Sequence, residues 1–258
     1  MLSAISDEAK RILDEAKKTG IVLRLFGGVA VKYHCPSATH RALQRSYPDL
    51  DFFGRGKQGR EIRKLFLDLG YEPNQRFNAL HGATRLIFED SKNQRVVDVF
   101  LDVFKMCHTL HLGNRLTLDE YTIPISDLLL TKLQVVEINE KDIRDLIAIL
   151  SDHEAVEHPS PGDREVIDAS YISNLCADDW GLCRTLSLTL AKLLTFLSKY
   201  ELEPEPKRIV GNRINRLLHA NETVPKSFKW RLRDKVGEKK RWYDLPEVPV
   251  RTESVSSA

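Results

Sequence analysis

Residues 47–53 read Tyr-Pro-Asp-Leu-Asp-Phe-Phe, which sets two carboxylates, Asp49 and Asp51, one residue apart. Side chains alternate between the faces of a strand, so we expect both acids on one side and Leu50 in the core. Two neighbouring carboxylates repel each other unless a positive charge lies between them. Hard cations such as Mg²⁺ prefer oxygen ligands. The stretch therefore predicts a strand that carries part of a divalent metal site.

A glycine pair, Gly27-Gly28, ends the apolar run of residues 21–26. The run predicts a strand, and residues 29–33 predict the start of a helix. Glycine lets the backbone approach a phosphate closely, and the N-terminus of a helix adds N–H donors and partial positive charge. A strand, a Gly-Gly turn and a helix can hold a triphosphate; the alternative is that the glycines only turn the chain.

A third acid is available in residues 95–104, which predict another strand. Asp98 lies among apolar residues, and period-two alternation places it on the same face as Asp102. An ionised acid at such a position requires a metal, a base or a solvated face. We expect Asp98 to be the third metal ligand; the alternative is an ion pair with Arg85 on the neighbouring predicted strand, residues 84–89.

The remaining patterns predict a mixed first half and an all-helical second half, which is an α+β fold. A further strand is predicted at 71–73, and 90–93 predicts the turn of a hairpin. Helices are predicted at 3–18, 60–69, 124–137, 140–151, 163–174, 178–200, 206–220 and 225–236. We expect a catalytic domain at 1–153, a linker at 154–163, a helical domain at 164–250 and a disordered tail at 251–258.

The composition of the 258 residues, 42% hydrophobic and 29% charged, is that of an ordinary globular protein. No run of about 18 apolar residues is present, so no membrane span is expected. The N-terminus is charged and lacks the pattern of a secretory signal. The four cysteines form no Cys-x-x-Cys pair, which favours free thiols in a reducing, cytoplasmic compartment over a zinc site.

Basic residues outnumber acids between residues 207 and 241, and Trp230, Trp242 and Tyr243 lie among or beside them. Aromatic side chains between bases can stack on nucleic acid bases, so this region is a candidate nucleic-acid contact. A solvated helix surface is the favoured explanation of the charges, and packing against the first half is the favoured explanation of the aromatic residues.

Three pieces in this order, residues 25–30 (Leu-Phe-Gly-Gly-Val-Ala), 49–51 (Asp-Leu-Asp) and 97–100 (Val-Asp-Val-Phe), resemble the DNA polymerase β-type nucleotidyltransferase superfamily. Two later stretches, 123–133 and 141–146, resemble motifs of its abortive-infection toxin branch. The resemblance covers roughly residues 20–150. One departure is the gap between Gly28 and Asp49, which is longer than in minimal nucleotidyltransferases and concerns the loop 35–46.

The resemblance implies a nucleotidyltransferase-type mixed sheet flanked by helices, and transfer of a nucleoside monophosphate from an NTP to a hydroxyl. The acceptor would be a protein side chain, a tRNA end or a small molecule, and a toxin–antitoxin role is implied. Mg²⁺ or Mn²⁺ would be the cofactor. The roles that the resemblance implies are metal binding and catalysis for Asp49, Asp51 and Asp98, and phosphate binding for Gly27, Gly28 and Lys132. Two further expectations rest on position in the sequence. Arg45 precedes the acid pair and can meet phosphate. Asp142 and Asp145 lie three apart on one helix face and can orient Lys132 or Arg144, or touch the nucleotide.

Several alternatives stand beside these roles. Lys132 is equally explained as a surface lysine on an amphipathic helix, and Arg45 as a solvated loop arginine. The whole chain has an alternative too, a nucleotidyltransferase fold that has lost its chemistry and only binds a nucleotide or a partner. Three intact acids argue against this last alternative.

Overall fold

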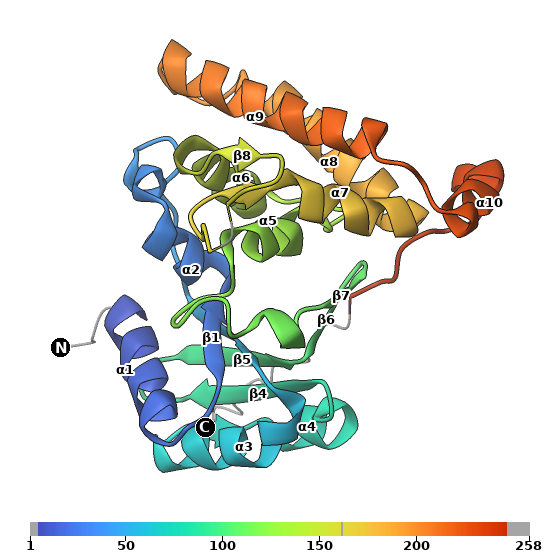
Figure 1. Ribbon diagram of the computed structural model, residues 1–258. Helices are drawn as coiled ribbons and strands as arrows, with labels where there is room; N and C mark the ends of the chain where they lie inside the picture. Colours follow the sequence, from blue (N-terminus) through green and yellow to red (C-terminus); the bar gives the residue numbers. More distant parts are fainter. Residues whose placement is uncertain (1–4, 161, 247–258) are drawn as a thin grey trace, which may run out of the picture.

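The strands around the two aspartates form one five-stranded sheet in the computed structural model, which describes residues 5–160 and 162–246 (Figure 1). The strand order is β1-β2-β5-β4-β3. The strands are β1 (Leu23–Phe26), β2 (Asp49–Gly54), β3 (Glu72–Pro73), β4 (Arg85–Asp90) and β5 (Arg95–Leu101). Within this sheet of the described residues, β2 and β5 pair in parallel and the other neighbours pair antiparallel, so the sheet is mixed.

One face of the sheet is apolar because alternate residues of β2 and β5 are hydrophobic. Leu50 and Phe52 lie opposite Val97 and Val99, and all four are fully buried. The helices α1 (Ile5–Lys18) and α3 (Gly59–Asp68) cover this face. The ring centroid of Phe66 on α3 lies 6.1 Å from that of Phe52.

Helices also lie on the other side of the sheet in more than one layer (Figure 1). These are α2 (Gly27–His34), α5 (Ile125–Leu133), α6 (Glu140–Asp152), α7 (Ala169–Asp178), α8 (Trp180–Leu197), α9 (Pro204–Thr223) and α10 (Phe228–Val236). Helix α9 is outermost, and α10 lies to one side. Helix α2 packs on α5 and α6, and α6 packs on α9. One continuous cluster of buried side chains contains residues of the sheet and of these helices. The fold is therefore mixed α+β, with helices following the sheet, as predicted.

The predicted strand 95–104 is wrong in its last part. Asp102 has a φ of +58°, which ends β5 and turns the chain into β6 (Val103–Lys105). β6 pairs with β7 (Thr109–His111), which the sequence did not predict. Asp102 lies outside β5, so the regular alternation that placed it on the face of Asp98 does not extend to it.

Other regions also differ from the predictions. Residues 75–81 form a short helix, α4 (Gln75–His81), which is capped by Asn74 and was not predicted. The predicted linker contains β8 (Ala155–Val156), which pairs in parallel with β9 (Ile167–Asp168), so the next helix begins only at Ala169. The predicted tail, 251–258, and the last residues of the predicted helical domain lie outside the described residues.

Among the described residues, no helix combines the length and the apolar character that crossing a membrane requires.

Candidate active site

The Gly-Gly turn lies directly against the Asp51 carboxylate. Phe26, the last residue of β1, is paired with Asp51 on β2, and the chain then turns into α2 at Gly27, where φ is +68°. A Cβ at Gly27 would overlap Oδ2 of Asp51, and a Cβ at Gly28 would overlap the Arg45 guanidinium. Only a backbone without side chains fits between these two groups.

A cleft of about 150 Å³ opens at this turn. Its lining residues are Gly28, Arg45, Tyr47, Pro48, Asp49, Asp51, Lys132, Asn139, Lys141 and Asp142. Most of the residues that the sequence proposed for a nucleotide site thus meet at one place, although they come from β2, α2, α5, α6 and the loop before β2. Gly27, Asp98 and Asp145 are not among the lining residues.

Asp98 is held in an ion pair. The parallel register sets it beside Asp51, but its oxygens accept hydrogen bonds from Arg85, at 2.9 Å to Oδ1 and 3.1 Å to Oδ2 from Nε. The pairing that the sequence left as an alternative is therefore present. Burial raises the pKa of Asp98, and the charge of Arg85 acts in the opposite direction.

Asp51 is the most unusual acid of the cleft. Burial, and then the negative charge of Asp98, raise the pKa of Asp51 to about 7, while Lys132 acts to lower it. A carboxyl that titrates near neutral pH is costly to maintain and is typical of sites where a proton or a cation is exchanged.

Lys132 and Arg45 compensate two acids on α6. Nζ of Lys132 lies 2.8 Å from Asp142 and 2.9 Å from Asp145. Asp145 is almost fully buried and also accepts from Arg45, at 2.8 Å from Nε and 2.7 Å from Nη2. Burial lowers the pKa of Lys132, but Asp145 and Asp142 outweigh that effect and raise it.

These contacts decide between several of the alternatives left open above. Lys132 is not a surface lysine, because its side chain is only 14% exposed. Asp142 and Asp145 both contact Lys132, whereas Arg144 pairs with Glu140 instead. Arg45 is not a solvated loop arginine either: it binds Asp145 and stacks at 4.3 Å on the ring of Tyr47.

The sequence analysis assigned no role to four lining residues, Tyr47, Pro48, Asn139 and Lys141. Asn139 had a recognisable signal, because an asparagine before a run of helix formers is a typical N-cap. Its side chain accepts from the N–H of Asp142 at 3.1 Å, which positions the first turn of α6. The stacking of Arg45 on Tyr47 had no such signal.

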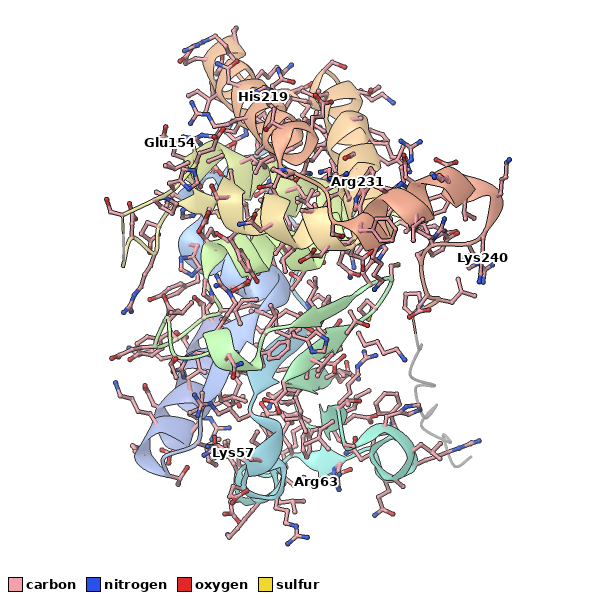
Figure 2. The ribbon with its side chains drawn as sticks, turned by 45° about the vertical axis from the view of Figure 1, so that its right-hand side comes forward. Lys57, Arg63, Glu154, His219, Arg231 and Lys240 are labelled. Atoms are coloured by element: carbon pink, nitrogen blue, oxygen red, sulfur yellow. The ribbon has the colours of Figure 1, made fainter. Side chains whose placement is uncertain are left out.

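The basic C-terminal segment lies apart from the sheet. Figure 2 shows Arg231 and Lys240 at the α10 end of the helical side, far from Lys57 and Arg63. The aromatic residues of this segment take part in packing: Nε1 of Trp242 donates to Thr185 at 3.0 Å, and Trp230 is partly buried against the core. A contact between this segment and nucleic acid stays a prediction.

No family model matches the chain, and the comparison with curated proteins finds no significant relative.

Gly27→Ala is expected to destabilise the protein by about 2 kcal/mol or more, since alanine is strained at positive φ and its Cβ meets the Asp51 carboxylate. The matched control is Gly20→Ala, because Gly20 has a φ of +71° and open space around it. We expect about 1 kcal/mol for the control in urea denaturation. Equal losses for both variants would show that contact with Asp51 does not matter at Gly27.

Proposed function

We propose that the chain is a nucleotidyltransferase, which moves a nucleoside monophosphate from an NTP to a hydroxyl. The observation that carries the proposal is the cleft in which Gly28 of the Gly-Gly turn meets Asp49, Asp51 and Lys132. This combination supplies a close backbone for phosphates, oxygen ligands for Mg²⁺ or Mn²⁺, and a cation in one place. The mixed sheet, with Asp51 beside Asp98, is compatible with a nucleotidyltransferase-type arrangement.

Asp49 and Asp51 fit a divalent cation. They lie on one side of β2, and the raised pKa of Asp51 reflects unrelieved negative charge and burial. A bound divalent cation would stabilise the negative charge that develops on the triphosphate. Asp51 would give up its proton to bind, and the N–H groups at the start of α2 would face the phosphates.

Lys132 is proposed to approach the phosphates from the opposite wall. Its ammonium is held by Asp142 and Asp145, so it is ordered before any ligand arrives. Arg45 is proposed to support this arrangement through Asp145 and to reach phosphate only by leaving that contact.

Asp98 shares its oxygens with Arg85 in this proposal. To bind the metal or to position the attacking hydroxyl, Asp98 must use lone pairs that Arg85 leaves free, or release one oxygen from Arg85. The Arg85–Asp98 pair also favours a second candidate function, a nucleotidyltransferase fold that binds a nucleotide or a partner without transfer. In that case Asp98 would stay paired when a nucleotide binds.

The test is incubation of the purified chain with NTPs, Mg²⁺ or Mn²⁺, and cell extract. Label on the α-phosphate is expected to reach an acceptor, whereas label on the γ-phosphate is not, which separates nucleotidyl from phosphoryl transfer. Digestion of the product with protease or ribonuclease then assigns the acceptor to protein, RNA or small molecule.

The test variant is Asp49→Asn/Asp51→Asn. The control variant is Glu157→Gln, which changes an exposed acid outside the cleft. Only the double variant is expected to lose transfer. Equal α-phosphate transfer by wild type and double variant would refute the assignment. Saturable NTP binding without transfer by wild type would instead support the binding protein.

A further inference from the structure

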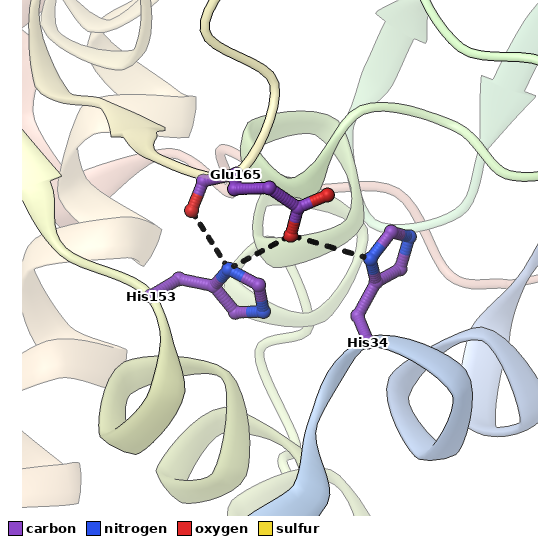
Figure 3. A group of neighbouring side chains, drawn as sticks. All are labelled: His34, His153 and Glu165. Carbon is purple, nitrogen blue, oxygen red and sulfur yellow. Dashed lines mark hydrogen bonds and ion pairs between the residues drawn. The ribbon is translucent and has the colours of Figure 1, made fainter.

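Two histidines with largely buried side chains and an exposed glutamate meet on the helical side of the molecule, outside the cleft (Figure 3). His34 is the last residue of α2, His153 directly follows α6, and Glu165 precedes β9. One ligand atom from each of the three side chains can be chosen so that all lie within 4.8 Å of one another. Figure 3 shows the Glu165 carboxylate between the two imidazoles.

The distances approach those of a metal site. Oε2 of Glu165 lies 3.8 Å from Nδ1 of His34 and 3.7 Å from Nδ1 of His153. Ligands of a tetrahedral ion with bonds of about 2.0–2.1 Å are about 3.3 Å apart. Shifts of a few tenths of an ångström would bring the glutamate oxygen to that spacing from each imidazole, and the two imidazoles, whose ligand atoms lie within 4.8 Å of each other, would also have to move closer together.

The hydrogen bonds of His34 suit a metal ligand. Its Nε2 lies 2.7 Å from Oγ1 of Thr122, so an N–H there leaves the lone pair on Nδ1, which faces Glu165. A ligating histidine usually donates its other ring N–H to a fixed acceptor in this way. Burial lowers the pKa of His34, which favours the neutral imidazole that binds metals.

His153 has an unsatisfied nitrogen in either neutral tautomer. Its Nδ1 lies 2.8 Å from the backbone oxygen of Glu165, and its buried Nε2 has no hydrogen-bond partner among the described residues. If Nδ1 carries the proton, the lone pair on Nε2 is buried without a partner. If Nε2 carries the proton, the lone pair on Nδ1 faces the backbone oxygen and Oε2 of Glu165. A cation between Nδ1 and these oxygens would remove the repulsion of the second case.

We propose that His34, His153 and Glu165 bind one divalent transition-metal ion of the zinc class. Imidazole and carboxylate ligands suit Zn²⁺ and its neighbours rather than Mg²⁺, which separates this site from the cleft. Glu165 is 69% exposed, so the site opens to solvent and leaves room for water as a further ligand. The proposal does not depend on the proposed function.

The ion would join three segments that are distant in sequence. His34 ends the helix that begins at Gly27, and His153 follows the helix that carries Asp142 and Asp145. A ligand that binds the folded chain but not the unfolded chain stabilises the folded state, so Zn²⁺ is expected to raise the melting temperature.

The test uses the full chain with the double substitution Asp49→Asn/Asp51→Asn, so that the two aspartates of the cleft do not compete for the ion. After treatment with chelator and dialysis, Zn²⁺ is titrated by calorimetry, and Co²⁺ is used as a spectroscopic probe. We expect one ion per chain, a visible ligand-field absorption of bound Co²⁺ and a higher melting temperature. The variants Glu165→Gln and His153→Gln are expected to bind about tenfold more weakly or worse.

His219→Gln is the matched control, because His219 is an exposed histidine on α9 (Figure 2) and is not one of the three grouped side chains. It is expected to bind as tightly as its parent. Glu165→Gln changes an exposed side chain and keeps the test valid if His153→Gln fails to fold. Absence of binding, or equal affinity for Glu165→Gln and His219→Gln, would overturn the proposal.

Discussion

Asp51→Asn is expected to reduce nucleotidyl transfer by about a thousandfold or more and, at pH 8, to make the protein more stable. The loss of activity follows from the proposed role of Asp51 as a metal ligand, because a metal supplies several kcal/mol of charge stabilisation. The gain in stability follows from burial, because the wild-type protein must keep an ionised carboxylate beside Asp98 at pH 8.

The sign of the pH dependence follows from the direction of the pKa shift. The pKa of Asp51 is raised from 3.8 to about 7 on folding, so folding favours the protonated acid. Its stabilising contribution is complete below pH 3.8 and is lost as the pH rises to about 7. The advantage of Asp51→Asn should therefore be absent near pH 4, grow between pH 4 and 7, and stay constant above. We expect about 1–3 kcal/mol at the plateau, because solvent in the cleft screens part of the charge.

Thermal unfolding between pH 4 and 9 and transfer assays at pH 8 measure the two effects. Glu157→Gln, which changes an exposed acid, is expected to show neither. A variant that keeps transfer within about tenfold of wild type would exclude Asp51 as a metal ligand. A stability difference that does not change with pH would contradict the raised pKa.

Lys132→Met is expected to lower the free energy of unfolding by about 3–5 kcal/mol. Methionine has a similar volume but no charge. The substitution therefore leaves Asp142 without its ammonium partner, and it leaves Asp145 with Arg45 as its remaining cation. Removing one partner of a buried ion pair costs this much, because the remaining charge is desolvated and uncompensated.

Urea denaturation of two further variants checks the cause. Lys141→Met removes an exposed lysine that lines the same cleft and is expected to change stability by about 0.5 kcal/mol at most. Lys132→Met/Asp142→Asn is expected to recover part of the loss, since one uncompensated carboxylate is gone. A loss below about 1 kcal/mol for Lys132→Met would mean that solvent already screens these acids.

The sequence predicted the elements of the cleft well where the signal is local. Alternation predicted the strand of Asp49 and Asp51, and the apolar run with two glycines predicted the turn into α2. The helices that carry Lys132 and Asp145 followed from their apolar periodicity, although α5 is shorter than predicted. The predicted position of Asp102 was wrong because its positive φ ends the alternation of the strand. No residue pattern in the sequence predicted that bend.

By itself, the sequence determined which side chains can carry charge or bind metal and on which strand or helix each one lies, because those properties depend on neighbours along the chain. The tertiary structure alone decided their partners. It paired Asp98 with Arg85, and it paired Arg45 with Asp145, which is 100 residues away in the sequence. It also placed His34 and His153 beside Glu165. Such contacts depend on how strands and helices pack, and a buried charge takes whichever partner the packing brings within hydrogen-bond distance.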